Sequence, residues 1–153
     1  MDTNESIDVL NNLIILNNDR IDGYKAAYSE TYKEELRNLF TKLEQTSLQC
    51  KTELESEVKR LGGTPDEGTM FLGKLHRGWM DIKSAIMGSD SETILSSCEY
   101  GEQTIIKAYE DALEDDDEEI NLEQKSMLNH QLTLLKGDYE KIKSMQTSIE
   151  KVV

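Results

Sequence analysis

Three carboxylates in this sequence lie where they could do chemistry. Glu102 falls on the inner line of a predicted helix, among apolar residues that recur at three- and four-residue steps. Glu44 and Asp138 lie at comparable depths on two other predicted helices. Because hard divalent cations prefer carboxylate oxygens, these three residues are candidates for a site that binds iron or another divalent metal, or that carries a proton.

The alternative to a metal is a hydrogen-bonded network inside the protein. A lone buried carboxylate costs several kcal/mol unless it is paired, hydrogen-bonded or protonated, so Glu102 needs a partner. Candidate partners lie on the same inner lines, namely Tyr24, Tyr109, Asn17 and Gln131. Such a network fixes the register of helices at some cost in stability. If Glu102 has this role, Glu102→Leu is expected to leave the fold intact.

The remaining reactive residues form no recognisable catalytic, cofactor-binding or metal motif. Cys50 and Cys98 are isolated thiols on apolar helix lines, and we interpret them as small buried hydrophobic residues. His76, close to Trp79, has no identified nucleophile or carboxylate partner, which favours a packing role. No phosphate-binding loop, serine elbow or zinc signature occurs. We therefore predict no catalytic residues and no cofactor.

The net charge of the chain disfavours some classes of binding partner. The chain of 153 residues carries 31 acidic and 17 basic residues, a net charge of −14. This charge repels a nucleic-acid backbone and an anionic membrane surface. No stretch of about eighteen apolar residues occurs, and the acidic start differs from a signal peptide. We expect a cytoplasmic protein that binds no nucleic acid and inserts into no membrane.

Hydrophobic spacing predicts helices throughout the chain. Thr31 and Glu34 have the spacing of a capping box at the start of the second helix, and Gly62-Gly63 is a typical helix end. Ser89 to Glu92 indicates another helix start. The predicted helices span residues 4–28, 31–62, 71–87, 91–114 and 119–152.

These lengths predict a single all-α domain over residues 1–153. The expected architecture is a ferritin-like four-helix bundle in which the short helix at 71–87 crosses from one end to the other, between the second and third long helices. An up-and-down array of five helices is the competing arrangement. The regular seam of residues 31–62 could face its own bundle or a second chain, which leaves homo-oligomerisation open.

Several short motifs carry a resemblance to a known family. These motifs span most of the chain and comprise Leu10–Ile14, Asp22–Tyr24, Leu61–Pro65, His76–Trp79, Gly101–Glu102, Tyr109 and Ala112–Leu113. On these motifs the chain resembles a bacterial family of uncharacterised ferritin-like four-helix-bundle proteins, known as a domain of unknown function. The resemblance implies the fold and a distant kinship with di-iron carboxylate proteins, but no established activity.

The chain departs from a di-iron carboxylate site in its ligands. Such a site takes Glu-x-x-His from each of two helices, whereas Ser47 stands at the histidine position after Glu44, and no such pair occurs near Gln131 to Asp138. This departure favours a non-enzymatic bundle that acts through its surface or its oligomeric state, by family analogy in a bacterial stress or envelope-associated process. The alternative is an atypical iron-binding or iron-oxidising protein.

Overall fold

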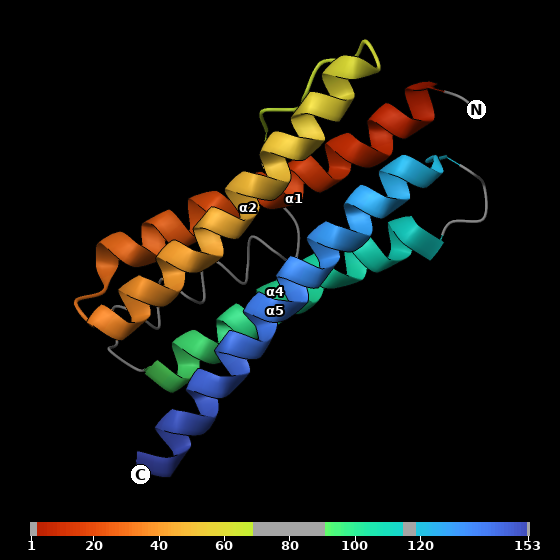
Figure 1. Cartoon of the computed structure of the whole chain (residues 1–153). Helices are drawn as coiled ribbons and strands as arrows, with labels where there is room; N and C mark the ends of the chain where they lie inside the picture. The colour runs from red at the N-terminus through yellow and green to blue at the C-terminus, as the bar shows by residue number, and fades with distance from the viewer. Residues whose placement is uncertain (1–2, 69–90, 115–118, 153) are drawn as a thin grey trace.

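The computed structural model describes residues 3–68, 91–114 and 119–152, and all regular structure in these segments is helical (Figure 1). This confirms the all-α class. The predicted helix at 71–87, with His76 and Trp79, lies outside the described residues. The described segments contain four helices, namely α1 (Thr3–Glu30), α2 (Glu34–Arg60), α4 (Ser91–Glu114) and α5 (Leu122–Val152).

The start of α2 corrects the predicted capping box. The cap residue is Lys33, which makes no side-chain cap bond, and the helix begins only at Glu34. The hydroxyl of Thr31 accepts a bond from the Lys33 backbone at 3.3 Å instead, so it closes a turn before the helix. The predicted start at residue 31 was therefore three residues too early.

The other end of α2 follows its sequence signal. Gly62 adopts a φ of 87°, a left-handed conformation that glycine takes without a Cβ clash. Its backbone N–H bonds to the Lys59 carbonyl, and the next N–H, from Gly63, bonds to the Val58 carbonyl at 2.9 Å. These two bonds satisfy carbonyls of the last turn and end the helix at Arg60.

The start of α5 has a reciprocal cap that was not predicted. The side chain of Asn121 accepts from the Gln124 backbone at 2.8 Å, and the Gln124 side chain accepts from the Asn121 backbone at 2.9 Å. This exchange satisfies two backbone donors and places the first helical residue at Leu122, rather than at residue 119.

Contacts between chain segments show which helix ends lie together. Near the beginning of α1, Asn11 donates to the Thr64 carbonyl at 3.2 Å, and the hydroxyl of Ser6 donates to the Glu119 carbonyl. The end of α2 and the connection into α5 therefore lie at the end of the bundle where α1 begins. At the opposite end, Lys33 contacts Ser91, which places the starts of α2 and α4 together.

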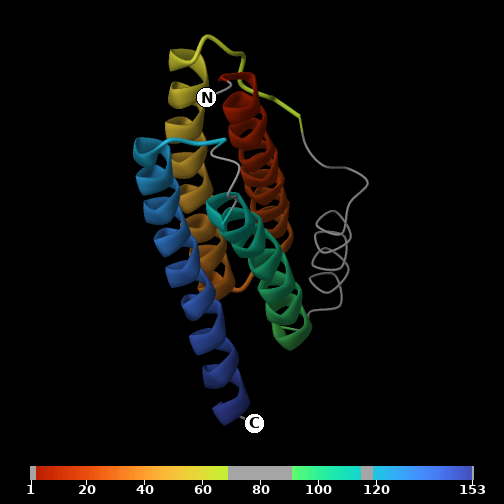
Figure 2. The same cartoon turned by 90° about the vertical axis from the view of Figure 1, so that its right-hand side faces the viewer.

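These contacts define the helix directions. α1 packs against α2 and α4, and α5 packs against α4 and α2, so each described helix has two neighbours in the bundle. Figure 2 shows these helices running lengthwise beside one another. α2 and α4 run in the same direction, while every adjacent pair is antiparallel. The end of α2 and the start of α4 therefore lie at opposite ends of the bundle.

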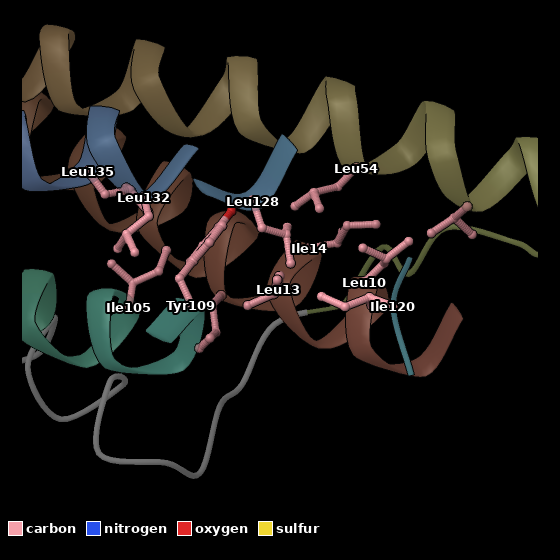
Figure 3. Packing of buried hydrophobic residues seen from close by; sticks show 12 residues of the cluster. Leu10, Leu13, Ile14, Leu54, Ile105, Tyr109, Ile120, Leu128, Leu132 and Leu135 are labelled. Atoms are coloured by element: carbon pink, nitrogen blue, oxygen red, sulfur yellow. The ribbon is translucent and has the colours of Figure 1, made fainter. Parts of the chain in front are cut away.

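The apolar core is divided into two clusters by a polar layer. The cluster nearer the start of α1 draws on all four helices, and Figure 3 shows Leu10, Ile14, Leu54 and Leu128 converging there. The cluster nearer the α1–α2 connection includes Tyr24, Ala27, Leu36, Leu39, Phe40, Leu43, Ile94, Leu95, Cys98 and Ile142.

The gap between the clusters occurs at one level in every helix. It holds buried polar residues, namely Asn17 and Arg20 in α1, Thr46 and Ser47 in α2, Glu102 in α4, and Asp138 in α5. Burial of the two clusters supplies the main driving force for folding. The polar layer between them is where chemistry or specificity can be concentrated.

Candidate functional site

Arg20 forms the centre of the polar layer. Its guanidinium is bonded to the carboxylate of Glu102 through two parallel hydrogen bonds: Nε donates to Oε1 and Nη2 donates to Oε2, both at 2.8 Å. Arg20 and Glu102 are 1% and 0% exposed. This is the bidentate geometry in which an arginine binds a carboxylate most strongly.

The other guanidinium donors are directed to the two remaining helices. Nη1 donates to the Leu43 carbonyl and to the Ser47 hydroxyl, both at 2.9 Å, on α2. Nη2 also donates to Asp138 Oδ2 at 3.1 Å, on α5. One side chain from α1 thereby binds α2, α4 and α5, because a buried cation needs partners that compensate its charge and its donors.

Tyr24 completes the shell around Glu102. Its hydroxyl donates to Glu102 Oε1 at 2.6 Å, and its ring lies 5.5 Å from the Arg20 guanidinium carbon. Burial raises the pKa of Tyr24 well above its usual value, and the Glu102 charge raises it further. The phenol is therefore a neutral, permanent donor.

The electrostatics favour a charged cluster. Burial is the largest single influence on the pKa of Arg20 and lowers it, but the charge and hydrogen bond of Glu102, together with the electrostatic effects of Tyr24 and Asp138, outweigh burial, so the pKa is raised overall. The second carboxylate, Asp138, gains further compensation from Lys141, whose Nζ lies 3.5 Å from Oδ1 and whose side chain is half exposed. We name Arg20, Glu102, Asp138, Tyr24 and Ser47 the charge layer.

A second group of polar side chains lies beside the charge layer, around Tyr109. Asn17 donates to the Tyr109 hydroxyl at 3.0 Å, and that hydroxyl donates to Gln131 Oε1 at 2.7 Å. Gln131 in turn donates to Glu53 at 3.0 Å. Asn17 Oδ1 is buried without a hydrogen-bond partner in the part of the chain that the structure describes.

The structure brings together two of the three carboxylates proposed as metal ligands. Glu102 and Asp138 share the guanidinium of Arg20, whereas Glu44 is directed away and lies 3.7 Å from Lys25 Nζ. Within residues 3–68, 91–114 and 119–152, no three His, Cys, Asp or Glu side chains are grouped as metal ligands. The donor set around Glu102 therefore does not fit the predicted metal site.

The predicted hydrogen-bonded network around Glu102 is confirmed only for Tyr24, because the predicted partners fall into two groups. Tyr24 bonds to Glu102, while Asn17, Tyr109 and Gln131 form the neighbouring chain of bonds. Sequence reasoning missed Arg20. Its signal was the spacing, since Arg20 lies three residues after Asn17 and four before Tyr24, on the same inner line.

Both cysteines are free and buried, as predicted. Burial raises the pKa of Cys50 to about 12 and raises that of Cys98 as well. Because the thiolate is the reactive form, neither residue has the environment of a catalytic nucleophile.

Fold and site together define an all-α four-helix bundle with a buried layer of compensated charge. The sequence matches the model of the DUF2383 family, described as a domain of unknown function, over residues 5–115, and the chain belongs to this family. A search of curated proteins finds no match. Among the described helices, none has the length and apolar character needed to cross a membrane.

Proposed function

We propose that this protein is a non-enzymatic, ferritin-like bundle that acts through its surface or its oligomeric state. The observation that carries the proposal is the position of Arg20. Its guanidinium lies between Glu102 and Asp138 and supplies the positive charge that two converging carboxylates would otherwise take from a metal ion.

The chemistry of the interior supports a structural role. Glu102 accepts three hydrogen bonds from Arg20 and Tyr24 and has no exposed surface, so it is engaged rather than available to a substrate. A general acid or base needs a reacting group within hydrogen-bond reach. In the described part of the chain, the polar layer links helices to one another.

The ferritin-like assignment is supported by the helix directions. α2 and α4 are parallel, and in ferritin-like bundles one long connection joins such a pair. We extend the proposal to a crossover helix at 71–87, a bacterial cytoplasmic setting and a stress-related process. These three extensions rest on sequence pattern and family analogy alone.

The competing function is an atypical iron-binding or iron-oxidising protein that uses Glu44, Glu102 and Asp138. The test is to load untagged protein with ferrous iron without oxygen, desalt it and measure iron by elemental analysis. We expect less than about 0.1 iron per chain, because the cluster already contains its cation.

Matched variants make this measurement decisive. About two iron atoms per chain would be the stoichiometry of a di-iron bundle site. If the wild type holds that amount, and both Glu102→Ala and Glu44→Ala lose it, the non-metal proposal is overturned. Iron that persists in both variants is bound elsewhere and equally contradicts a protein without a metal role.

A further inference from the structure

A groove runs between α2 and α5 on one face of the bundle. Its volume is about 700 Å³, and Leu39 and Met145 contribute apolar surface to it. Figure 1 looks onto this face, with α2 and α5 in front of α1 and α4. Both helices contribute polar and charged side chains to its edges.

The groove lies in the half of the bundle that is nearly neutral. On the side of the charge layer where α1 begins, residues 3–19, 44–68, 103–114 and 119–135 contain fourteen acidic and five basic residues. On the groove side, residues 20–43, 91–102 and 136–152 contain ten acidic and nine basic residues. Two copies of this acidic chain therefore repel each other least when their groove halves meet.

The α5 edge of the groove contains a self-complementary stretch. The edge is lined in order by Gly137, Glu140, Lys141, Ser144, Met145 and Ser148, and the first four residues form this stretch. If two α5 helices cross antiparallel about the midpoint between Glu140 and Lys141, each acid faces the base of the other copy. Gly137 then faces Ser144, and two small residues permit close approach of the helices.

The α2 edge has the same property. Glu35, Asn38, Leu39 and Lys42 line it, and an antiparallel crossing about the midpoint of Asn38 and Leu39 places each Glu35 opposite a Lys42. On each edge taken by itself, an antiparallel crossing of two copies thus pairs opposite charges. This is the self-complementarity that a twofold interface requires.

We propose that the groove between α2 and α5 is the docking surface for a second copy of this chain, with α2 on α2 and α5 on α5 in antiparallel crossings. This proposal rests on the proposed function, and it identifies the surface through which two copies associate. The balanced edge charges distinguish this partner from a strongly basic protein, which would be drawn to the acidic half instead.

The test is sedimentation equilibrium of the full chain, with Gly137→Trp as the principal variant. A Cβ at Gly137 meets no atom within 4 Å, and tryptophan has a higher helix propensity than glycine, so the isolated bundle tolerates the change. The indole occupies the interface. We expect a wild-type dimer and at least about a hundredfold higher dissociation constant for the variant.

The matched control is Asn129→Trp, which adds the same ring at an exposed position of α5 outside the groove. We expect it to dimerise like the wild type. A control that weakens the dimer as much as Gly137→Trp would mean that the ring acts nonspecifically, and the groove assignment would be lost.

Charge reversal tests the orientation of the two copies. Glu35→Lys or Lys42→Glu alone places like charges opposite each other twice per dimer, and we expect about a tenfold weaker dimer. The double variant reverses both signs and restores the pairing, so its affinity should return to within about threefold of the wild type. Loss without restoration contradicts the antiparallel crossing.

Oligomeric state and iron content separate the two proposals. A monomer at all concentrations up to about 200 µM, where a micromolar dimer is largely formed, overturns the second-copy proposal. If that monomer also holds no iron, the non-enzymatic function stands with another partner. If the protein holds iron, the proposed non-enzymatic function is refuted, whether or not the protein dimerises.

Discussion

Removing the guanidinium from the charge layer is the most direct test of how the bundle is held together. In Arg20→Met the apolar stem is retained approximately, but the cation is lost. Glu102 and Asp138, with side chains 0% and 3% exposed, are then left in the interior without the arginine that both contact. Breaking a buried ion pair from one side costs about 3–5 kcal/mol.

That loss is large beside the total stability of a domain, which is about 5–15 kcal/mol. The measurement is urea denaturation followed by helical circular dichroism, in which an m-value of about 2 kcal/mol per molar makes the expected midpoint shift about 1.5–2.5 M. Urea is used because guanidinium ions could themselves compensate the two carboxylates.

The control is Lys25→Met, which removes a cation that is mostly exposed and only 3.7 Å from Glu44. An exposed pair of this kind is worth about 0–1 kcal/mol. If Arg20→Met costs no more than Lys25→Met, the charge layer does not hold the helices together and our reasoning fails.

The same geometry changes the expectation for Glu102. Sequence alone suggested that Glu102→Leu leaves the fold intact, but the structure shows that this change deprives a buried arginine of its bidentate partner. We now expect the single substitution to be strongly destabilising. Replacing Arg20, Glu102 and Asp138 together by apolar residues of similar volume should recover most of the loss, as is often found for buried ion clusters.

Three further predictions concern other residues of the interior and surface. A thiol reagent at neutral pH should leave Cys50 and Cys98 unmodified in the folded protein and label both in urea, because burial raises both pKa values; labelling at the unfolded rate contradicts their burial. Hydrogen bonds from Gln146 and from nearby Lys143 lower the pKa of Glu99 below its usual 4.5, so its contribution to stability is present above that pH and is lost as the pH falls through the lowered value. Glu99→Gln should therefore reduce the loss of unfolding free energy as the pH falls through the acidic range, and an unchanged pH dependence would show that Glu99 does not contribute to it. Tyr109→Phe removes a hydroxyl that both accepts and donates inside the bundle, and it should cost about 1–3 kcal/mol in urea denaturation, whereas a neutral effect would mean that its bonds are not needed.

Periodic spacing was sufficient to predict the helices because the burial of one face is a local property of each segment. It located α4 at residues 91–114 and the end of α2 near Gly62, where a glycine adopts the left-handed conformation. It also identified Glu102 and Asp138 as polar interruptions of apolar lines. Each of these features depends on residues a few positions apart.

The pairing of the interior polar groups was decided only by the tertiary structure. Sequence placed Glu44 and Asp138 at comparable depths, but Glu44 pairs with Lys25 at 3.7 Å and keeps some exposure, whereas Asp138 is buried and pairs with Arg20 at 3.1 Å. Sequence reasoning did not single out Arg20, because arginine is rarely buried without compensation. The carboxylates, the hydroxyl and the carbonyl that compensate Arg20 lie on α2, α4 and α5, far away in sequence. The residue pattern of α1 alone therefore does not predict them.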